Sequence, residues 1–171
     1  LDAALADFEE PEADLAPLAA ELGHLIVFRS FSKAHAMAGF RAGYAVGPRD
    51  AGDLLARLAP PLGVSSPAQA GMAWAAENGE RYLPRRRVLA TAERERLAEA
   101  LAGTPLAFPT GCGPLIWLSS AEHHGPELAA HLASHRIFVS PGTAWGDERH
   151  VRIALRGREA TERLVSALGS L

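Results

Sequence analysis

Hydrophobic and polar residues follow one another along the chain with periods that predict helices and short strands. In the first half, apolar residues recur every three to four positions in three segments, which is the spacing of an amphipathic helix. These predicted helices cover residues 11–22, 50–58 and 67–78, and Ser66 is the predicted N-cap of the third. Between the first two, segments rich in β-branched and aromatic residues predict strands at 24–29 and 41–47. A helix followed by two strands with a loop between them predicts a layered α/β core.

The second half opens with a long predicted helix over residues 80–102, rich in Arg and Glu, which Gly103 ends. Its apolar positions are Leu83, Val88, Leu89, Leu97 and Leu101. Beyond it the pattern alternates between strand and helix. It predicts strands at 115–119, 137–140 and 150–155, and helices at 126–134 and 158–168. This layout is typical of a small α+β domain, so residues 1–79 and 80–171 are interpreted as separate domains.

Composition narrows the class of protein. The chain has 171 residues, 48% of them hydrophobic and 22% charged, which is typical of a globular protein. The net charge of −3 gives no reason to expect nucleic acid as a partner, and no apolar run approaches the roughly 18 residues of a membrane span. The single cysteine, Cys112, excludes an internal disulfide and a cysteine-cluster metal site. We predict no metal site and a reducing, cytoplasmic environment, and because the chain opens at Leu1 without Met we expect a fragment of a longer protein.

Lys33 is the residue that carries the most chemical information. Of 17 Lys and Arg residues it is the only lysine, and an amine can attack a carbonyl to form an imine where a guanidinium cannot. Around it, Ser30 and Arg41 can bind a phosphate, and Gly39 and Gly43 allow close approach of the backbone. Each of these residues taken alone is also compatible with an ordinary surface role. Their combination over one short segment indicates a binding site for a phosphorylated aldehyde.

The segment S-F-S-K followed by A-G-F-R-A-G-Y, residues 30–44, resembles the lysine signature of fold-type-I aminotransferases of class I/II, which depend on pyridoxal 5′-phosphate (PLP). It is most similar to the histidinol-phosphate aminotransferase group. The resemblance implies that Lys33 holds PLP as an imine (a Schiff base) and moves a proton between Cα and C4′. It also implies that Ser30 and Arg41, with Ser32 as a possible further ligand, bind the cofactor phosphate.

The same resemblance implies a fold. Residues 1–79 are expected to be the C-terminal part of the PLP-binding large domain, an α/β domain with a mixed, mostly parallel sheet. Residues 80–171 are expected to be the small C-terminal α+β domain. The preceding half of such an enzyme, which carries the phosphate loop and the ring that stacks on the cofactor, is not in this sequence.

The start of the chain is similar to the D-E-A-Y stretch that ends a sheet strand in this family. The resemblance implies that Asp2 pairs with the pyridinium nitrogen and keeps it protonated. Ala3 stands in place of the usual Glu, and Leu5 in place of the Tyr that meets the cofactor O3′. His35 either lines the pocket beside Lys33 or points outward.

Near the other end, V-S-P-G-T-A-W-G followed by H-V-R-I-A-L is similar to the family's V-x-P-G-x-x-F-G segment and the arginine strand after it. The resemblance implies that Arg152 binds the substrate α-carboxylate through a two-pronged salt bridge. Trp145 is expected to pack near the site entrance without touching the substrate.

The expected function is transamination between an amino acid or amino-alcohol phosphate and a 2-oxo acid, in a homodimer that needs the missing N-terminal half. A PLP-dependent decarboxylase of the threonine-phosphate decarboxylase type remains an alternative, because the bond that breaks depends on a pocket largely outside this sequence. A non-catalytic remnant of the fold is a third possibility. The sequence leaves the amino donor and acceptor open.

Overall fold

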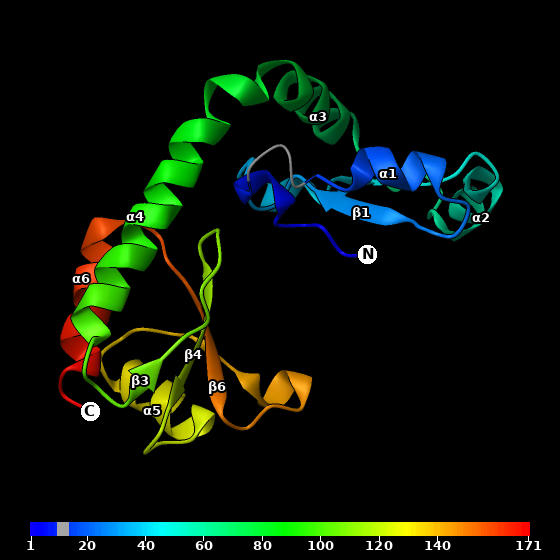
Figure 1. Ribbon diagram of the computed structural model, residues 1–171. Helices are drawn as coiled ribbons and strands as arrows, with labels where there is room; N and C mark the ends of the chain where they lie inside the picture. The colour runs from blue at the N-terminus through cyan, green and yellow to red at the C-terminus, as the bar shows by residue number, and fades with distance from the viewer. Residues whose placement is uncertain (10–13) are drawn as a thin grey trace. The chain divides into compact units, whose positions relative to one another are not determined.

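The computed structural model describes residues 1–9 and 14–171 and divides into two compact units, Leu1–Arg87 and Val88–Leu171 (Figure 1). The N-terminal unit contains α1 (Ala16–Glu21), β1 (Val27–Ser30), β2 (Gly43–Val46), α2 (Ala51–Leu58) and α3 (Ser66–Asn78). Helix α4 (Leu83–Leu101) begins in this unit and ends in the C-terminal one. The C-terminal unit continues with β3 (Leu106–Ala107), β4 (Leu115–Ser120), α5 (Gly125–Ser134), β5 (Ser140–Pro141), β6 (His150–Ala154) and α6 (Arg158–Leu168).

In the N-terminal unit, β1 and β2 form an antiparallel pair that runs from Val27 opposite Val46 to Ser30 opposite Gly43. Asp2 adds a single parallel bridge to Phe28 on β1, and a 3-10 helix follows at Ala6–Phe8. Gly43 is required for the close pairing, because a Cβ there would lie 2.6 Å from the Arg29 carbonyl oxygen. At Gly39 a Cβ would meet no atom within 4 Å, so close approach is not observed there.

Helix α3 packs against the loop that joins β1 to β2. Phe31, Met37 and Ala42 from the loop form a buried cluster with alanines of α3. Gly71 allows this contact, since a Cβ on Gly71 would lie 2.6 Å from the Met37 methyl carbon. The N-cap of α3 is Ser65, whose Oγ accepts a hydrogen bond from the Ala68 N–H at 3.3 Å; the prediction that Ser66 is the cap is wrong by one residue.

The C-terminal unit is an antiparallel sheet with strand order β3-β4-β6-β5, whose core is shared with helices α4, α5 and α6. Alternation along the strands decides which side chains enter this core. Ile116 and Leu118 of β4 and Val151 and Ile153 of β6 are buried among the helices. Residues between them, such as Arg152, therefore lie on the opposite face.

The predicted strand at residues 137–140 is wrong, because only Ser140–Pro141 pairs with β6. The N–H of Ile137 donates to the Leu132 carbonyl in the last turn of α5, so the backbone of Ile137 is bonded to the helix end and not to a strand. Helix α4 begins at Leu83, after a 3-10 turn at Gly79–Arg81, and the short strand β3 was not predicted. Of the predicted apolar positions on α4, Leu97 and Leu101 are buried, whereas Val88 and Leu89 are 68% and 54% exposed.

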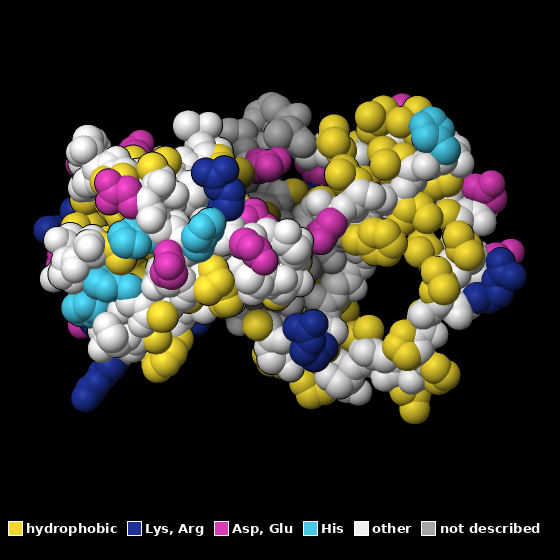
Figure 2. Space-filling model, turned by 90° about the horizontal axis from the view of Figure 1, so that it is seen from below, with side chains coloured by type: hydrophobic (Ala, Val, Ile, Leu, Met, Phe, Trp, Pro, Cys, Tyr) yellow, Lys and Arg dark blue, Asp and Glu magenta, His cyan; other side chains and the backbone are white. Residues whose placement is uncertain are grey.

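The predicted helix at 11–22 lies partly outside the described residues, and its described part is α1. Among the described helices, none has both the length and the apolar content needed to cross a membrane. Within the same residues, no group of three or more His, Cys, Asp or Glu side chains could hold a metal ion. Several large apolar side chains are exposed, including Leu62, Trp74 and Phe138. Figure 2 shows one face of the molecule, where hydrophobic side chains lie at the surface among charged ones.

Candidate active site

The loop after β1 presents Lys33 to solvent while the residues around it are held in place. Phe31 and Met37 are buried, and the Met37 N–H donates to the Phe31 carbonyl at 3.0 Å, which closes the base of the loop. At its tip the Ala36 N–H donates to the Lys33 carbonyl at 3.1 Å. The result is a tight turn with an anchored base and an exposed amine at Lys33.

Ser30, Ser32 and Arg41 lie at the two ends of the same loop. The Ser30 hydroxyl oxygen accepts a hydrogen bond from the Ser32 N–H at 3.2 Å, so its own proton can still be donated to a ligand. Arg41 is exposed, has a left-handed backbone conformation with φ of 53°, and donates from Nη1 to the Ala38 carbonyl at 2.9 Å. That bond uses one of the five N–H donors of a guanidinium. The hydroxyls, the guanidinium and the amine of Lys33 are thus gathered on one β1–β2 connection.

Asp2 lies beside β1. The Ala3 N–H donates to the Phe28 carbonyl and the Phe28 N–H to the Leu1 carbonyl, both at 2.9 Å. The Asp2 side chain is exposed and accepts from the Ala4 N–H at 2.9 Å. Because the pairing with Phe28 is parallel, Asp2 aligns with the strand that leads directly to Ser30.

Arg152 belongs to the C-terminal unit and lies on the sheet face away from the core. Its guanidinium carbon is 4.4 Å from the centroid of the Trp145 ring, and Trp117 is its register partner on β4. The rings of Trp117 and Trp145 meet edge to face with centroids 5.6 Å apart. An arginine whose guanidinium lies over an indole ring can still direct its N–H donors to a planar anion.

The carboxylate of Asp147 contacts this group of aromatic side chains. Asp147 Oδ2 accepts a hydrogen bond from the Trp117 indole N–H at 3.2 Å and lies 2.8 Å from His150 Nδ1. The hydrogen bond with His150, followed by one from the Arg149 backbone N–H, lowers the pKa of Asp147 to about 2. Asp147 is therefore a carboxylate at any pH near neutrality, and it fixes the Trp117 ring that stacks on His150.

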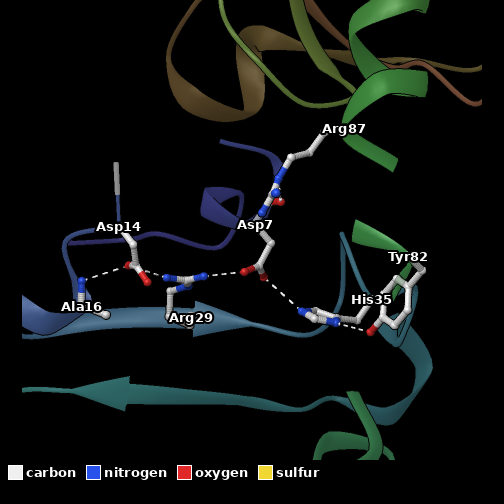
Figure 3. A network of polar contacts seen from close by, with 7 residues as sticks. All are labelled: Asp7, Asp14, Ala16, Arg29, His35, Tyr82 and Arg87. Carbon is white, nitrogen blue, oxygen red and sulfur yellow. Dashed lines mark hydrogen bonds and ion pairs between the residues drawn. The ribbon is translucent and has the colours of Figure 1, made fainter. Parts of the chain in front are cut away.

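A second group of polar residues includes His35, which belongs to the same loop as Lys33 (Figure 3). Asp7 pairs with Arg29 through one carboxylate oxygen and with His35 Nε2 through the other, at 3.1 Å for His35. Arg29 also donates to Asp14 at 2.6 Å. His35 Nδ1 lies 2.7 Å from the Tyr82 hydroxyl. Both ring nitrogens of His35 are therefore engaged in this network, and the side chain does not point outward.

Burial raises the pKa of Asp7, but the hydrogen bond from His35 and the charge of Arg29 outweigh it and hold that pKa below its usual value. A cavity of about 600 Å³ borders the network and is lined by Asp7, Ser30, His35 and Tyr44 among others. Lys33 and Arg41 are not among its lining residues. The cavity is thus distinct from the exposed amine and guanidinium of the loop.

This network was not predicted from the sequence, although one signal for it was present. Arg29 follows Val27 by two positions on β1. Side chains two positions apart on a strand face the same side, so Arg29 lies on the buried face with Val27. A guanidinium on a buried face needs a carboxylate partner. Which acids supply it depends on where Asp7 and Asp14 lie relative to β1, and the strand pattern does not contain this information.

Comparison with known proteins decides the family. The model of the family "Aminotransferase class I and II" matches residues 1–168. The chain belongs to the class I and II aminotransferases. Membership confirms the resemblance inferred from the lysine segment, and it implies PLP as the cofactor of the family.

Two relatives show how much of an aminotransferase this chain represents. Histidinol-phosphate aminotransferase 1 of Nitrosococcus oceani is 31% identical over 145 residues, which are 85% of this chain and 39% of that protein. An aromatic amino acid aminotransferase of Mycobacteroides abscessus is 35% identical over 132 residues, which are 77% of this chain and 38% of that protein. The aminotransferase chain thus spans about two fifths of the length of these relatives.

Solved structures agree on the fold. The histidinol-phosphate aminotransferase of Clostridium acetobutylicum matches with a TM-score of 0.83 at 21% identity, over 99% of this chain and 52% of that one. L-threonine-O-3-phosphate decarboxylase of Porphyromonas gingivalis matches with a TM-score of 0.79 at 19% identity, over 99% and 53%. At these identities the likeness shows the fold alone. The expected α/β class is confirmed: the aminotransferase chain has part of the PLP-transferase fold.

The described residues fit this cofactor. An exposed amine, two serine hydroxyls and an exposed guanidinium on one loop are the donor set that an aldehyde carrying a phosphate requires. The exposed Asp2 carboxylate, aligned with the strand that leads to this loop, suits a protonated ring nitrogen.

Proposed function

We propose that the protein containing this chain is a PLP-dependent aminotransferase that moves an amino group between an amino acid or amino-alcohol phosphate and a 2-oxo acid. The observation that carries the proposal is the only lysine of the chain, exposed at the tip of an anchored turn between Ser30 and Arg41. An exposed lysine alone would be unremarkable, but this one lies in a class I and II aminotransferase chain with phosphate-binding groups on both sides.

Each residue has a defined task in this proposal. When bound, PLP supplies an electron sink that stabilises negative charge at the substrate Cα. Lys33 attaches the cofactor covalently and, once released, accepts and returns a proton with its amine. Ser30, Ser32 and Arg41 bind the phosphate, and Asp2 holds a proton on the ring nitrogen by its negative charge.

Arg152 binds the substrate carboxylate. Its guanidinium can form two parallel hydrogen bonds to a carboxylate, and contact with the Trp145 ring limits the orientations that it adopts. Trp145 is 52% exposed, so its indole also borders the space in front of Arg152. This arrangement supports an α-amino acid or its 2-oxo acid as one substrate.

Leu5 and Ala3 depart from the family pattern. Leu5 cannot donate a hydrogen bond to the cofactor O3′, and Ala3 carries no carboxylate. We expect the departure at Leu5 to change the basicity of the Lys33 amine in the bound enzyme more than the affinity for PLP, because the phosphate contacts and Asp2 are retained.

The relatives support two donor classes for this site, since one is a histidinol-phosphate aminotransferase and the other an aromatic amino acid aminotransferase. The histidinol-phosphate class is preferred on the form of the lysine segment. A decarboxylase remains the second candidate, because L-threonine-O-3-phosphate decarboxylase has the same fold. A remnant without chemistry is disfavoured, since the lysine and its phosphate-binding neighbours are all present.

Further features of the enzyme are proposed from the family resemblance. We expect activity to need the preceding half, which in the family supplies the phosphate loop and the stacking ring, and we expect a cytoplasmic homodimer. The chain alone, with few sheet strands to hold PLP, is expected to give no turnover on the ordinary scale of about 1–10³ per second.

The deciding experiment gives the intact protein PLP, a panel of amino donors that includes histidinol phosphate and aromatic amino acids, and a 2-oxo acid. Formation of a new amino acid together with a new carbonyl product supports transamination. Release of carbon dioxide without amino transfer assigns the decarboxylase reading instead. Neither product in a folded protein that retains PLP contradicts both and leaves the non-catalytic reading.

A further inference from the structure

His35 follows Lys33 by two residues, and partners from distant segments hold both nitrogens of its ring. Nδ1 lies 2.7 Å from the Tyr82 hydroxyl, and Nε2 lies 3.1 Å from Asp7 Oδ2 (Figure 3). The side chain is only 9% exposed, and its ring lies 4.8 Å from the buried ring of Phe31. The imidazole therefore connects the Lys33 turn to the start of the chain and to the segment that precedes α4.

The partners of His35 are themselves fixed. Asp7 is held by Arg29 through its side chain and by Arg87 through its backbone carbonyl, which accepts from Nε at 2.9 Å. The Tyr82 ring stacks on Trp74 with centroids 5.8 Å apart and planes 7° from parallel. A side chain tied to fixed groups on two sides loses most of its freedom to turn, and so does the backbone that carries it.

The protons in this network can satisfy every bond at once. An imidazole with its proton on Nε2 donates to Asp7 and accepts from Tyr82 at Nδ1. Burial of Tyr82 raises its pKa, as does the charge of Asp7, whereas Arg86 opposes them, so the hydroxyl keeps the proton that it donates. The lowered pKa of Asp7 keeps that carboxylate an acceptor.

The turn that His35 anchors is costly to form. Ala36 has a φ of 58°, a left-handed conformation that is unfavourable for a residue with a Cβ. Such a conformation persists only where neighbouring contacts hold it. The Lys33 carbonyl and the Ala36 N–H close the turn, and His35 lies between these two residues.

From these contacts we propose that His35 is a positioning residue for Lys33, which acts by clamping the turn to Asp7 and Tyr82. The clamp keeps Phe31 and Met37 of the loop buried while the amine of Lys33 stays exposed to solvent. Its importance for catalysis rests on the proposed role of Lys33, whereas the clamp itself is a property of this chain and is testable without the cofactor.

The test compares His35→Phe and Tyr82→Phe with His24→Phe, a change of an exposed histidine, in the intact protein without added PLP. Amide hydrogen exchange at residues 32–36 and the rate at which acetic anhydride labels Lys33 are measured. His35→Phe keeps the ring but removes both hydrogen bonds, one of them to a charged group, so exchange at residues 32–36 should rise about tenfold or more. The Lys33 labelling rate should change with it, while β1, β2 and α3 change less than about twofold.

Tyr82→Phe removes one hydrogen bond and should raise exchange at the same amides by a smaller factor, and the His24 control should leave them unchanged. Unchanged exchange and labelling in folded His35→Phe overturn the proposal. Equal loss of protection throughout Leu1–Arg87 also overturns it, because His35 would then stabilise the unit as a whole. If His35→Phe does not fold, Tyr82→Phe decides by the same two criteria. Loss of PLP attachment with unchanged exchange would concern the proposed function and not the clamp.

Discussion

The guanidinium carbon of Arg152 lies 4.4 Å from the centroid of the Trp145 ring, and Trp117 faces Arg152 across the pair of strands. This contact orients a planar cation on the exposed face of a small sheet. It distinguishes Arg152 from an arginine at an ordinary strand edge. Replacing Arg152 is therefore expected to change substrate binding.

Arg152→Lys should raise the KM for both the amino and the oxo substrate by about tenfold to a hundredfold, because a hydrogen bond between charged groups contributes roughly 1.5–3 kcal/mol and the ammonium cannot form the parallel pair. Affinity for PLP should stay within about twofold. Steady-state kinetics and PLP titration provide the measurements. Arg156→Lys, at an exposed position near the end of the same strand, is the matched control. Unchanged KM values for Arg152→Lys would place the carboxylate site elsewhere.

Lys33 should carry PLP covalently in the intact protein. Borohydride reduction followed by peptide mapping should find a pyridoxyl group on Lys33, because imine formation needs an unprotonated amine that can reach the aldehyde. Lys33→Arg keeps the positive charge but should abolish both the label on this peptide and amino transfer. The role of Lys33 is refuted by full activity in Lys33→Ala or by a label that stays on another residue.

The pH dependence of the C-terminal unit should reveal Asp147. Its pKa in the folded protein is about 2, below the usual 3.8, so its stabilising effect is complete above about pH 4 and is lost as the pH falls through 2. Asp147→Asn should therefore lower the urea midpoint near neutral pH and have no effect below about pH 2. Tryptophan fluorescence follows this change through the Trp117 hydrogen bond. Asp53→Asn, at an exposed site on α2, should show no such pH-dependent difference.

Leu97 and Leu89 provide a matched pair on helix α4. Leu97 is fully buried and Leu89 is 54% exposed. Leu97→Ala should destabilise the C-terminal unit by about 2–5 kcal/mol through lost burial and a cavity, whereas Leu89→Ala should change stability by less than about 0.5 kcal/mol. Urea unfolding with amide exchange of β4 and β6 measures both. Equal effects would mean that the exposed face of α4 is covered in solution.

The family, the lysine loop and most elements were predictable because they depend on short segments. Helix α6 has the predicted bounds, Arg158–Leu168, and α3 ends at Asn78 as predicted but begins one residue earlier, since helical period and terminal signals are local. Lys33 was proposed in the same way, because a sole lysine among serines, glycines and an arginine is visible without any knowledge of distant contacts.

Only the tertiary structure decided which distant groups meet. The pairing of Arg29 with Asp7, the two partners of His35 and the contact of Arg152 with Trp145 join residues that are up to 47 positions apart, as for His35 and Tyr82. The strand expected at residues 137–140 failed for a local reason: its apolar residues are compatible with a strand, but the Ile137 N–H donates a hydrogen bond to the Leu132 carbonyl at the end of α5. Local sequence sets the conformations that a segment can adopt. Burial and hydrogen bonding with distant segments then select among these conformations, and the contacts of His35 with Asp7 and Tyr82 result from that selection.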